Sequence, residues 1–135
     1  MAATFEIEIA TPERLLVKEQ VSEAQIPCGG SAGEIGVLPG HAPLLSELGI
    51  GQLSYVVNGS RHKLSVAGGV VEVLPEHVRV LAMVAERPDE IDFARAQAAE
   101  KRAMERLASV QQNVDSARAL NALKRAQARL GVAQK

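Results

Sequence analysis

Four side chains of this sequence have types suited to nucleophilic or metal chemistry: Cys28, His41, His62 and His77. No histidine has a partner at a metal-binding spacing such as H-x-x-x-H, and a single cysteine excludes a multi-cysteine metal site and an internal disulfide. His62 and His77 fall at apparent strand ends, where an imidazole that faces solvent needs no role. Cys28 would be a nucleophile only beside a base, and a small semi-buried residue is its commoner role. We predict no catalytic site and no metal site; a small enzyme that uses Cys28 or His41 is the weaker alternative.

The glycine-rich stretch GEIGVLPGH, residues 33–41, does not match a phosphate-binding loop. Neither G-x-x-x-x-G-K-[ST] nor a G-x-G-x-x-G that opens a helix is present. The glycines permit a tight backbone path and Pro39 stiffens it. We therefore predict that this stretch shapes a rigid surface for a partner.

The end of the chain carries the strongest charge signal, because residues 116–135 hold five basic side chains and no acidic one. At about 100° per residue, three of the arginines share one helix face and three leucines lie roughly opposite. The two sets are Arg118, Arg125 and Arg129, and Leu120, Leu123 and Leu130. The basic face is either a solvated surface or a contact for an acidic surface or a phosphate group, and the lack of interleaved acids favours the contact.

The composition limits the other classes of function. A chain of 135 residues forms one domain, or one small domain with an appendage. The net charge of -1 gives no general attraction to nucleic acid, and with 2% aromatic residues and no Trp there is little for base stacking. No signal peptide is expected, and the longest apolar run, VRVLAMVA, is too short to span a bilayer. We predict no nucleic-acid partner and no direct insertion into lipid.

Period-two alternation predicts strands over most of residues 4–85. TFEIEIA alternates apolar and acidic residues, and Asn58-Gly59 suits a tight hairpin between QLSYVV and HKLSVAGGVVEV. PEHVRVLAMVAE supplies a further strand after a turn at Pro75. The glycines of AGGVVEV indicate a bulge or a close approach of two backbones. Together these features predict an all-β N-terminal sandwich or flattened barrel over residues 1–87.

After Arg87-Pro88 the pattern becomes helical and rich in Ala, Glu, Lys and Arg. Residues 89–109 and 117–130 are predicted to form the two helices of a C-terminal α-helical hairpin, residues 88–135. Asp89 or Asp92 would cap the first helix, Asp115 the second, and Gly131 would end it. The apolar stripe of the first helix is mostly alanine: Ala96, Ala99, Ala103, Leu107 and Val110. Alanine buries little area, so at about 25 cal/mol per Å² we expect weak packing and more than one arrangement of the hairpin.

Three stretches, GEIGVLPGHAPLLSEL, LSVAGGVVEVLPEHVRVLA and AERPDEIDFARAQAA, resemble in order and spacing the epsilon subunit of bacterial F-type ATP synthase. The resemblance covers nearly the whole chain and implies a non-catalytic subunit of the central stalk. Its sandwich would bind the gamma subunit and rest on the c-ring, with Glu34 and His41 near the ring. The resemblance also implies a peripheral location on the cytoplasmic side of the bacterial plasma membrane.

The same resemblance implies a regulatory hairpin. In the inhibited state its second helix would meet the beta subunit, with the alpha subunit as a further candidate, and block ATP hydrolysis. The residues carried over for the beta contact are Arg118, Lys124, Arg125 and Arg129.

IDFARA, residues 91–96, is similar to the nucleotide motif of some epsilon subunits. No cofactor is required, but regulatory ATP is implied. The residues that would contact ATP are Glu86, Asp92, Arg95, Arg102, Arg125 and Arg129. A free-standing nucleotide-sensing protein with a β-sandwich scaffold is the alternative function.

Overall fold

The computed structural model describes residues 3–30, 32–109 and 115–133. Its strands form a 7-stranded sheet in the order β2-β1-β7-β6-β5-β3-β4. Strands β1 and β7 pair in parallel, whereas the other neighbours pair antiparallel. The strands are β1 (Phe5–Ala10), β2 (Leu15–Val21), β3 (Glu23–Pro27), β4 (Glu34–Val37), β5 (Leu44–Val57), β6 (Ser60–Leu74) and β7 (His77–Glu86).

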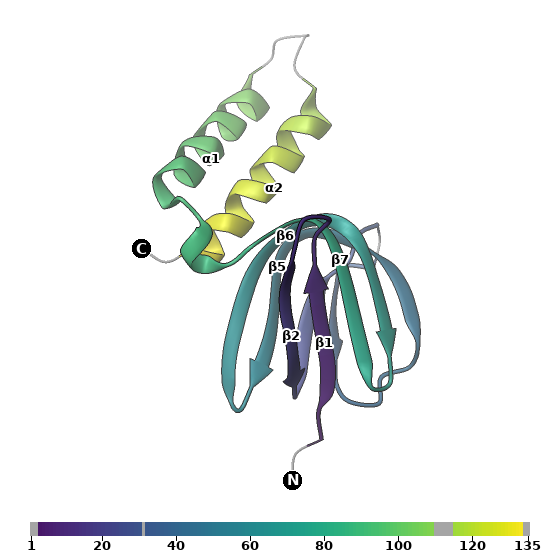
Figure 1. The fold of residues 1–135 in the computed structure, drawn as a ribbon. Coiled ribbons are helices and arrows are strands. Elements are labelled where there is room, and N and C mark those ends of the chain that lie inside the picture. Colours follow the sequence, from purple (N-terminus) through teal and green to yellow (C-terminus); the bar gives the residue numbers. More distant parts are fainter. Residues whose placement is uncertain (1–2, 31, 110–114, 134–135) are drawn as a thin grey trace.

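The sheet bends over on itself, so that its two halves face each other across one core (Figure 1). Alternation explains the inward face of β1, in which Phe5, Ile7 and Ile9 are buried and the residues between them are not. Cys28 is buried in the same core cluster, more deeply than the semi-buried position predicted for it. Strands β2, β3 and β4 complete the aliphatic core. The sequence pattern predicted strands in this region but not the bounds of these three.

The predicted hairpin at Asn58-Gly59 is confirmed, since both residues have positive φ, 48° and 81°, between β5 and β6. Gly68 and Gly69 mark a close backbone approach and no bulge, because the pairing register of β6 with β7 stays constant there. A Cβ on Gly69 would collide with the carbonyl oxygen of Leu81, and its φ of 133° is rarely adopted by other residues. Only glycine therefore fits at position 69, where the backbones of β6 and β7 approach closely.

Two helices follow the sheet after a single 3-10 turn, η1 (Pro88–Glu90): α1 (Phe93–Ala108) and α2 (Ser116–Val132). Asp92 caps α1 and Asp115 caps α2, each accepting a backbone N–H at 3.1 Å. Asp89 lies within η1 and caps neither helix. The prediction that α2 ends at Gly131 was wrong by one residue: α2 continues to Val132, and Gly131 lies against the side chain of Gln52.

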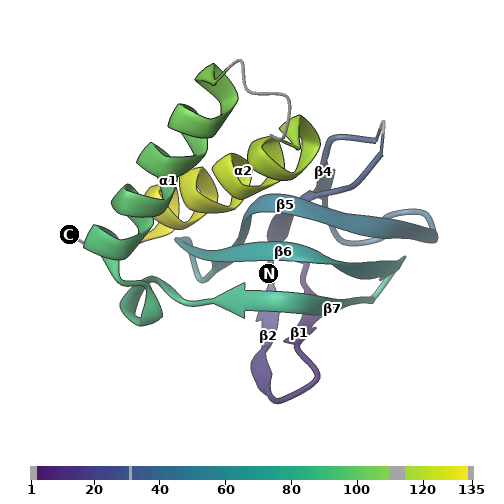
Figure 2. The ribbon, with the colours of Figure 1, turned by 90° about the horizontal axis from the view of Figure 1, so that it is seen from above.

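Helix α2 lies between α1 and the sheet, where it contacts β5 and β6 (Figure 2). The predicted fold class, an all-β sandwich followed by a helical hairpin, is confirmed. The hairpin is thus docked on the sandwich, with α1 on the outer side.

Candidate functional site at the helical hairpin

The contact between the two helices consists largely of alanine. Ala96 and Ala103 are the buried residues of α1, and Ala119 and Ala126 are buried on α2. Leu107 and Leu120 stay partly exposed, at 37% and 42%, and the predicted apolar position Val110 is outside the described residues. Because each alanine buries little area, this interface contributes little stability, as expected from the sequence.

Four arginines share one face of the hairpin. Each directly precedes one of the four buried alanines, and in antiparallel helices the residue before an inward-facing residue turns to the same side on both helices. All four are exposed. We call this surface the arginine face, and its members are Arg95, Arg102, Arg118 and Arg125.

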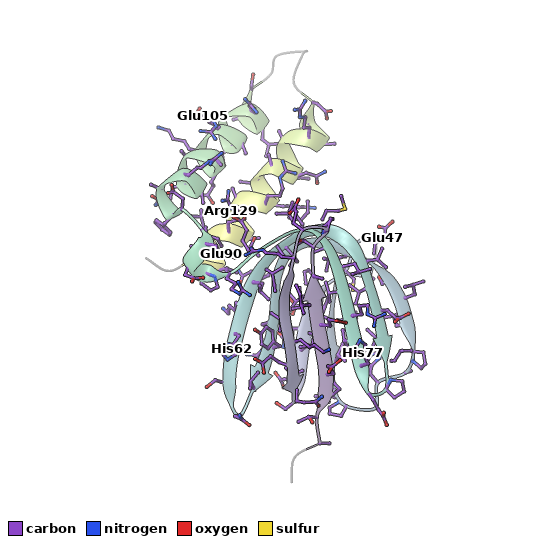
Figure 3. All side chains as sticks on the ribbon, in the orientation of Figure 1. Glu47, His62, His77, Glu90, Glu105 and Arg129 are labelled. Atoms are coloured by element: carbon purple, nitrogen blue, oxygen red, sulfur yellow. The ribbon has the colours of Figure 1, made fainter. Side chains whose placement is uncertain are left out.

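Arg129 differs from these four because its side chain is only 25% exposed and is paired. Its Nε lies 2.9 Å from Glu86 Oε1, and its Nη2 donates to Glu86 Oε2 at 3.3 Å. The Nε contact is an ion pair without the alignment of a hydrogen bond. Figure 3 shows Arg129 where the end of α2 meets the sandwich. Glu86 and Arg129 therefore tie α2 to the last residue of β7.

The six residues implied for ATP contact are only partly brought together. Glu86 and Arg129 pair directly, and the Asp92 carboxylate accepts the backbone N–H of Arg95. The remaining members, Arg102 and Arg125, extend the set along the arginine face. The acidic members thus contact other members of the set, Glu86 through its pair with Arg129 and Asp92 through the N–H of Arg95.

The four residues implied for the beta contact do not share one surface in this docked state. Arg118 and Arg125 lie on the exposed arginine face, while Arg129 is occupied by Glu86. Lys124 instead lines a shallow hollow of about 370 Å³ between α2 and β5, together with Ile50, Gly51, Gln52, Gln127 and Ala128. Release of the hairpin would be needed to present all four.

Glu34 and His41 lie at opposite ends of the GEIGVLPGH segment. Glu34 is exposed at the start of β4, and His41 follows that strand, with Nδ1 2.7 Å from the Ala42 carbonyl oxygen. The Gly40 N–H donates to the Pro75 carbonyl at 2.8 Å, which ties the segment to the turn between β6 and β7. The segment is thus held on the sandwich in a defined path.

Of the other two histidines, His62 is exposed, as the sequence suggested, whereas His77 is less exposed than expected. His77 is half-buried, with Nδ1 3.2 Å from Glu6 Oε1 and Nε2 3.8 Å from Glu8 Oε2. The ring of His62 stacks on Tyr55 at 5.3 Å between centroids. Both contacts join neighbouring strands, which sequence spacing alone did not reveal.

A network beside the hairpin was missed altogether. Arg14 forms a two-pronged pair with Glu90, whose Oε1 also accepts the Arg87 N–H at 2.8 Å. The guanidinium of Arg14 and the Arg87 N–H lower the pKa of Glu90 to about 2. The spacing of Arg87, Pro88 and Glu90 carried a helix-start signal, but nothing in the sequence links position 14 to position 90.

Comparison with known families agrees with this architecture. Residues 4–88 match the beta-sandwich domain of the ATP synthase delta/epsilon chain, and residues 89–134 match its long alpha-helix domain. The chain belongs to the ATP synthase delta/epsilon family. The resemblance inferred from the sequence is confirmed.

Curated relatives in this family are named ATP synthase epsilon chain. One from Solibacter usitatus is 59% identical over 76% of this chain and 75% of its own length, and one from Koribacter versatilis is 55% identical over 79% and 74%. The epsilon chain is a regulatory stalk subunit rather than a catalytic one, so the prediction that this family member is not itself an enzyme is confirmed.

Solved structures share the fold of the family. A chain of the Euglena gracilis mitochondrial ATP synthase, in a structure of its OSCP/F1/c-ring, has a TM-score of 0.80 over 96% of this chain and 80% of its own, at 23% identity. A chain from the Tetrahymena thermophila mitochondrial ATP synthase central stalk and c-ring has a TM-score of 0.54 over 95% and 92%, at 14% identity.

Proposed function

We propose that this chain is a central-stalk rotor subunit of a bacterial proton-translocating ATP synthase, and that its hairpin inhibits ATP hydrolysis. The sandwich binds gamma and rests on the c-ring, coupling proton flow to ATP synthesis. The family and the names of the relatives support this assignment. The subunit is peripheral, on the cytoplasmic side of the plasma membrane. In the described part of the chain, no helix has the length and hydropathy to cross a bilayer.

The observation that carries the regulatory part is the contrast between the two sides of the hairpin. Small residues such as Ala128 and Gly131 face the sandwich, with the Glu86–Arg129 pair beside them, so docking is weak. The arginine face is exposed. Only release of the hairpin would leave all four residues implied for the beta contact free to meet a partner: Arg118, Lys124, Arg125 and Arg129. A weakly held helix with a basic surface suits a reversible electrostatic contact with an acidic segment of the beta subunit.

An exposed apolar patch on the sandwich offers a surface for gamma. Val70 of β6 pairs with Leu81 of β7, and both are exposed, as are Met83 and Val84. Exposed clusters of large apolar side chains commonly mark protein contacts. In the assignment proposed here, Glu34 and His41 remain the residues near the c-ring. Variants of the two regions should distinguish the gamma contact from the c-ring contact. Leu81→Glu should weaken binding to gamma, and Glu34→Ala should leave binding to gamma unchanged.

We propose further that the hairpin binds ATP through Glu86, Asp92, Arg95, Arg102, Arg125 and Arg129. Planar guanidinium groups can bond phosphate oxygens in pairs, and three arginines of this set lie on the exposed arginine face, while the fourth, Arg129, is paired with Glu86. At about 100 times the dissociation constant, ATP would stabilise the docked form by roughly 2.7 kcal/mol.

Calorimetric titration of the isolated chain with ATP tests this site, with Arg125→Ala as the variant and Lys101→Ala as an exposed control on α1. Binding that Arg125→Ala abolishes and Lys101→Ala retains supports the site. Equal binding by both variants contradicts it. A chain that runs alone in cell extracts, outside any multisubunit complex, would favour the free-standing nucleotide sensor instead.

A further inference from the structure

The segment that joins the sandwich to the hairpin is bonded to the sandwich. Arg14, in the turn between β1 and β2, donates to the two oxygens of Glu90 at 2.6 and 2.9 Å. Arg87 Nη2 donates to the Leu16 carbonyl at 2.6 Å. The segment from Arg87 to Glu90 is therefore bonded to the β1–β2 turn and to β2.

Glu90 also closes η1 internally. Its Oε1 accepts the Arg87 N–H at 2.8 Å, and its own N–H donates to the Arg87 carbonyl at 3.0 Å. A two-pronged guanidinium–carboxylate pair fixes orientation as well as distance. These contacts fix the orientation of η1 on the sandwich.

The contacts change at the next two residues. Ile91 is buried with Ala96 and Val132, and the Asp92 side chain caps α1. Both residues have extended backbones, with φ of -92° and -80°. They join a segment bonded to the sandwich to a segment packed within the hairpin.

We propose that Arg14 and Glu90 are positioning residues that keep η1 on the sandwich in both the docked and the released state, so that the hairpin turns about Ile91 and Asp92. The proposal rests on the proposed function in one respect, that the hairpin moves. The change of composition at Arg87-Pro88 would have placed the pivot before η1.

Distances between pairs of spin labels on the full-length chain test the pivot. The labels are placed on cysteines introduced at the exposed positions Gln20, Asp89 and Glu105, in a Cys28→Ser background. Ala128→Glu puts a charge against β5 and releases α2. On release the Gln20–Glu105 distance should broaden or shift, while the Gln20–Asp89 distance stays single and narrow. A Gln20–Asp89 distance that changes as much as Gln20–Glu105 would overturn the proposal.

Glu90→Gln then tests the pair itself. In the released chain this variant should broaden the Gln20–Asp89 distance, and Arg14→Lys, which keeps the charge, should broaden it less than Arg14→Ala. Arg79→Ala, which removes a different arginine–glutamate pair on β7, is the control and should have no effect. A narrow Gln20–Asp89 distance in Glu90→Gln contradicts the role of Glu90. Because these measurements use the isolated chain, they are independent of whether the assembled complex is inhibited.

Discussion

Arg129 near the end of α2 and Glu86 at the end of β7 form an ion pair, Nε to Oε1 2.9 Å, across 43 residues of sequence. Both side chains are about three-quarters buried, at 25% and 24% exposed. The pair lies where the helical hairpin meets the sandwich, so the carboxylate holds in place an arginine that the proposed ATP and beta-subunit contacts would both use. Docking and the beta-subunit contact therefore compete for one guanidinium group.

Replacing Glu86 with Gln should loosen the docked hairpin. A charge-assisted contact of this exposure contributes about 1 kcal/mol, or about fivefold in the ratio of docked to released forms. Amide hydrogen exchange in the last two turns of α2 should become correspondingly faster. Glu105→Gln, at an exposed position far along α1, is the control and should leave this exchange unchanged. Equal exchange in both variants would show that the pair does not secure α2.

The contact of Gly131 with Gln52 gives a second test of docking. Alanine at position 131 gains up to about 1 kcal/mol of helix propensity, but its Cβ would collide with the Gln52 side-chain amide. Gly131→Ala should therefore stabilise the chain more in a Gln52→Ala background than in the native one. Thermal unfolding of the four proteins of this double-mutant cycle measures the difference. Strictly additive effects would mean that α2 does not rest against β5 at this point.

Gly69→Ala should destabilise the sandwich by about 3 kcal/mol or more. The added Cβ meets the Leu81 carbonyl and the backbone adopts a φ of 133°, so strain and collision act together. Gly36→Ala is the matched control, because Gly36 also lies in a strand but has open space at its Cβ position and no positive φ. Denaturant unfolding should show a large loss in the first variant and almost none in the second.

The low pKa of Glu90 predicts a pH dependence. Its pKa falls from 4.5 to about 2, chiefly through the Arg14 hydrogen bond. A carboxyl whose pKa is lowered in the folded state contributes stability above its unfolded pKa and loses it as the pH falls through the folded value. The stability difference between the native chain and Arg14→Ala should therefore be constant above about pH 5 and shrink between pH 4.5 and 2.

An NMR titration of the Glu90 carboxyl should show its pKa rising toward 4.5 in Arg14→Ala. An unchanged titration in that variant would mean that Arg14 does not set it. Arg61→Ala, which removes a pair with Glu23 elsewhere on the sandwich, should leave the Glu90 titration as in the native chain.

Local patterns carried most of the fold. Alternation of apolar and acidic residues predicted β1, and Asn58-Gly59 predicted the turn of the longest hairpin. Asp92 and Asp115 marked the starts of the two helices. Each of these features depends on near neighbours in sequence. Gly131 was misread for the opposite reason: a glycine near a helix end usually caps it, but here the absence of a side chain serves a tertiary contact.

Part of the candidate site was likewise predictable from the sequence, and part depends on contacts between distant residues. Helical spacing placed Arg118 and Arg125 on one face of the second helix, and the resemblance singled out Arg95 and Arg102 on the first. That the four share one side of the hairpin required the antiparallel packing of the two helices. The Arg14–Glu90 pair spans 76 residues and no period or motif predicts it. The resemblance to a family supplied residue types, whereas the structure showed that Lys124 faces β5 and that Arg129 is already paired.

The central claim is that the hairpin inhibits ATP hydrolysis, and the most direct measurement is the hydrolysis rate of the assembled synthase that contains this subunit. The variant carries alanine at Arg118, Lys124, Arg125 and Arg129, and Lys101→Ala is the control. The account predicts that the fourfold variant still assembles but hydrolyses ATP several times faster than the native complex, while Lys101→Ala matches the native rate. A fourfold variant that assembles and hydrolyses ATP at the native rate would contradict the account.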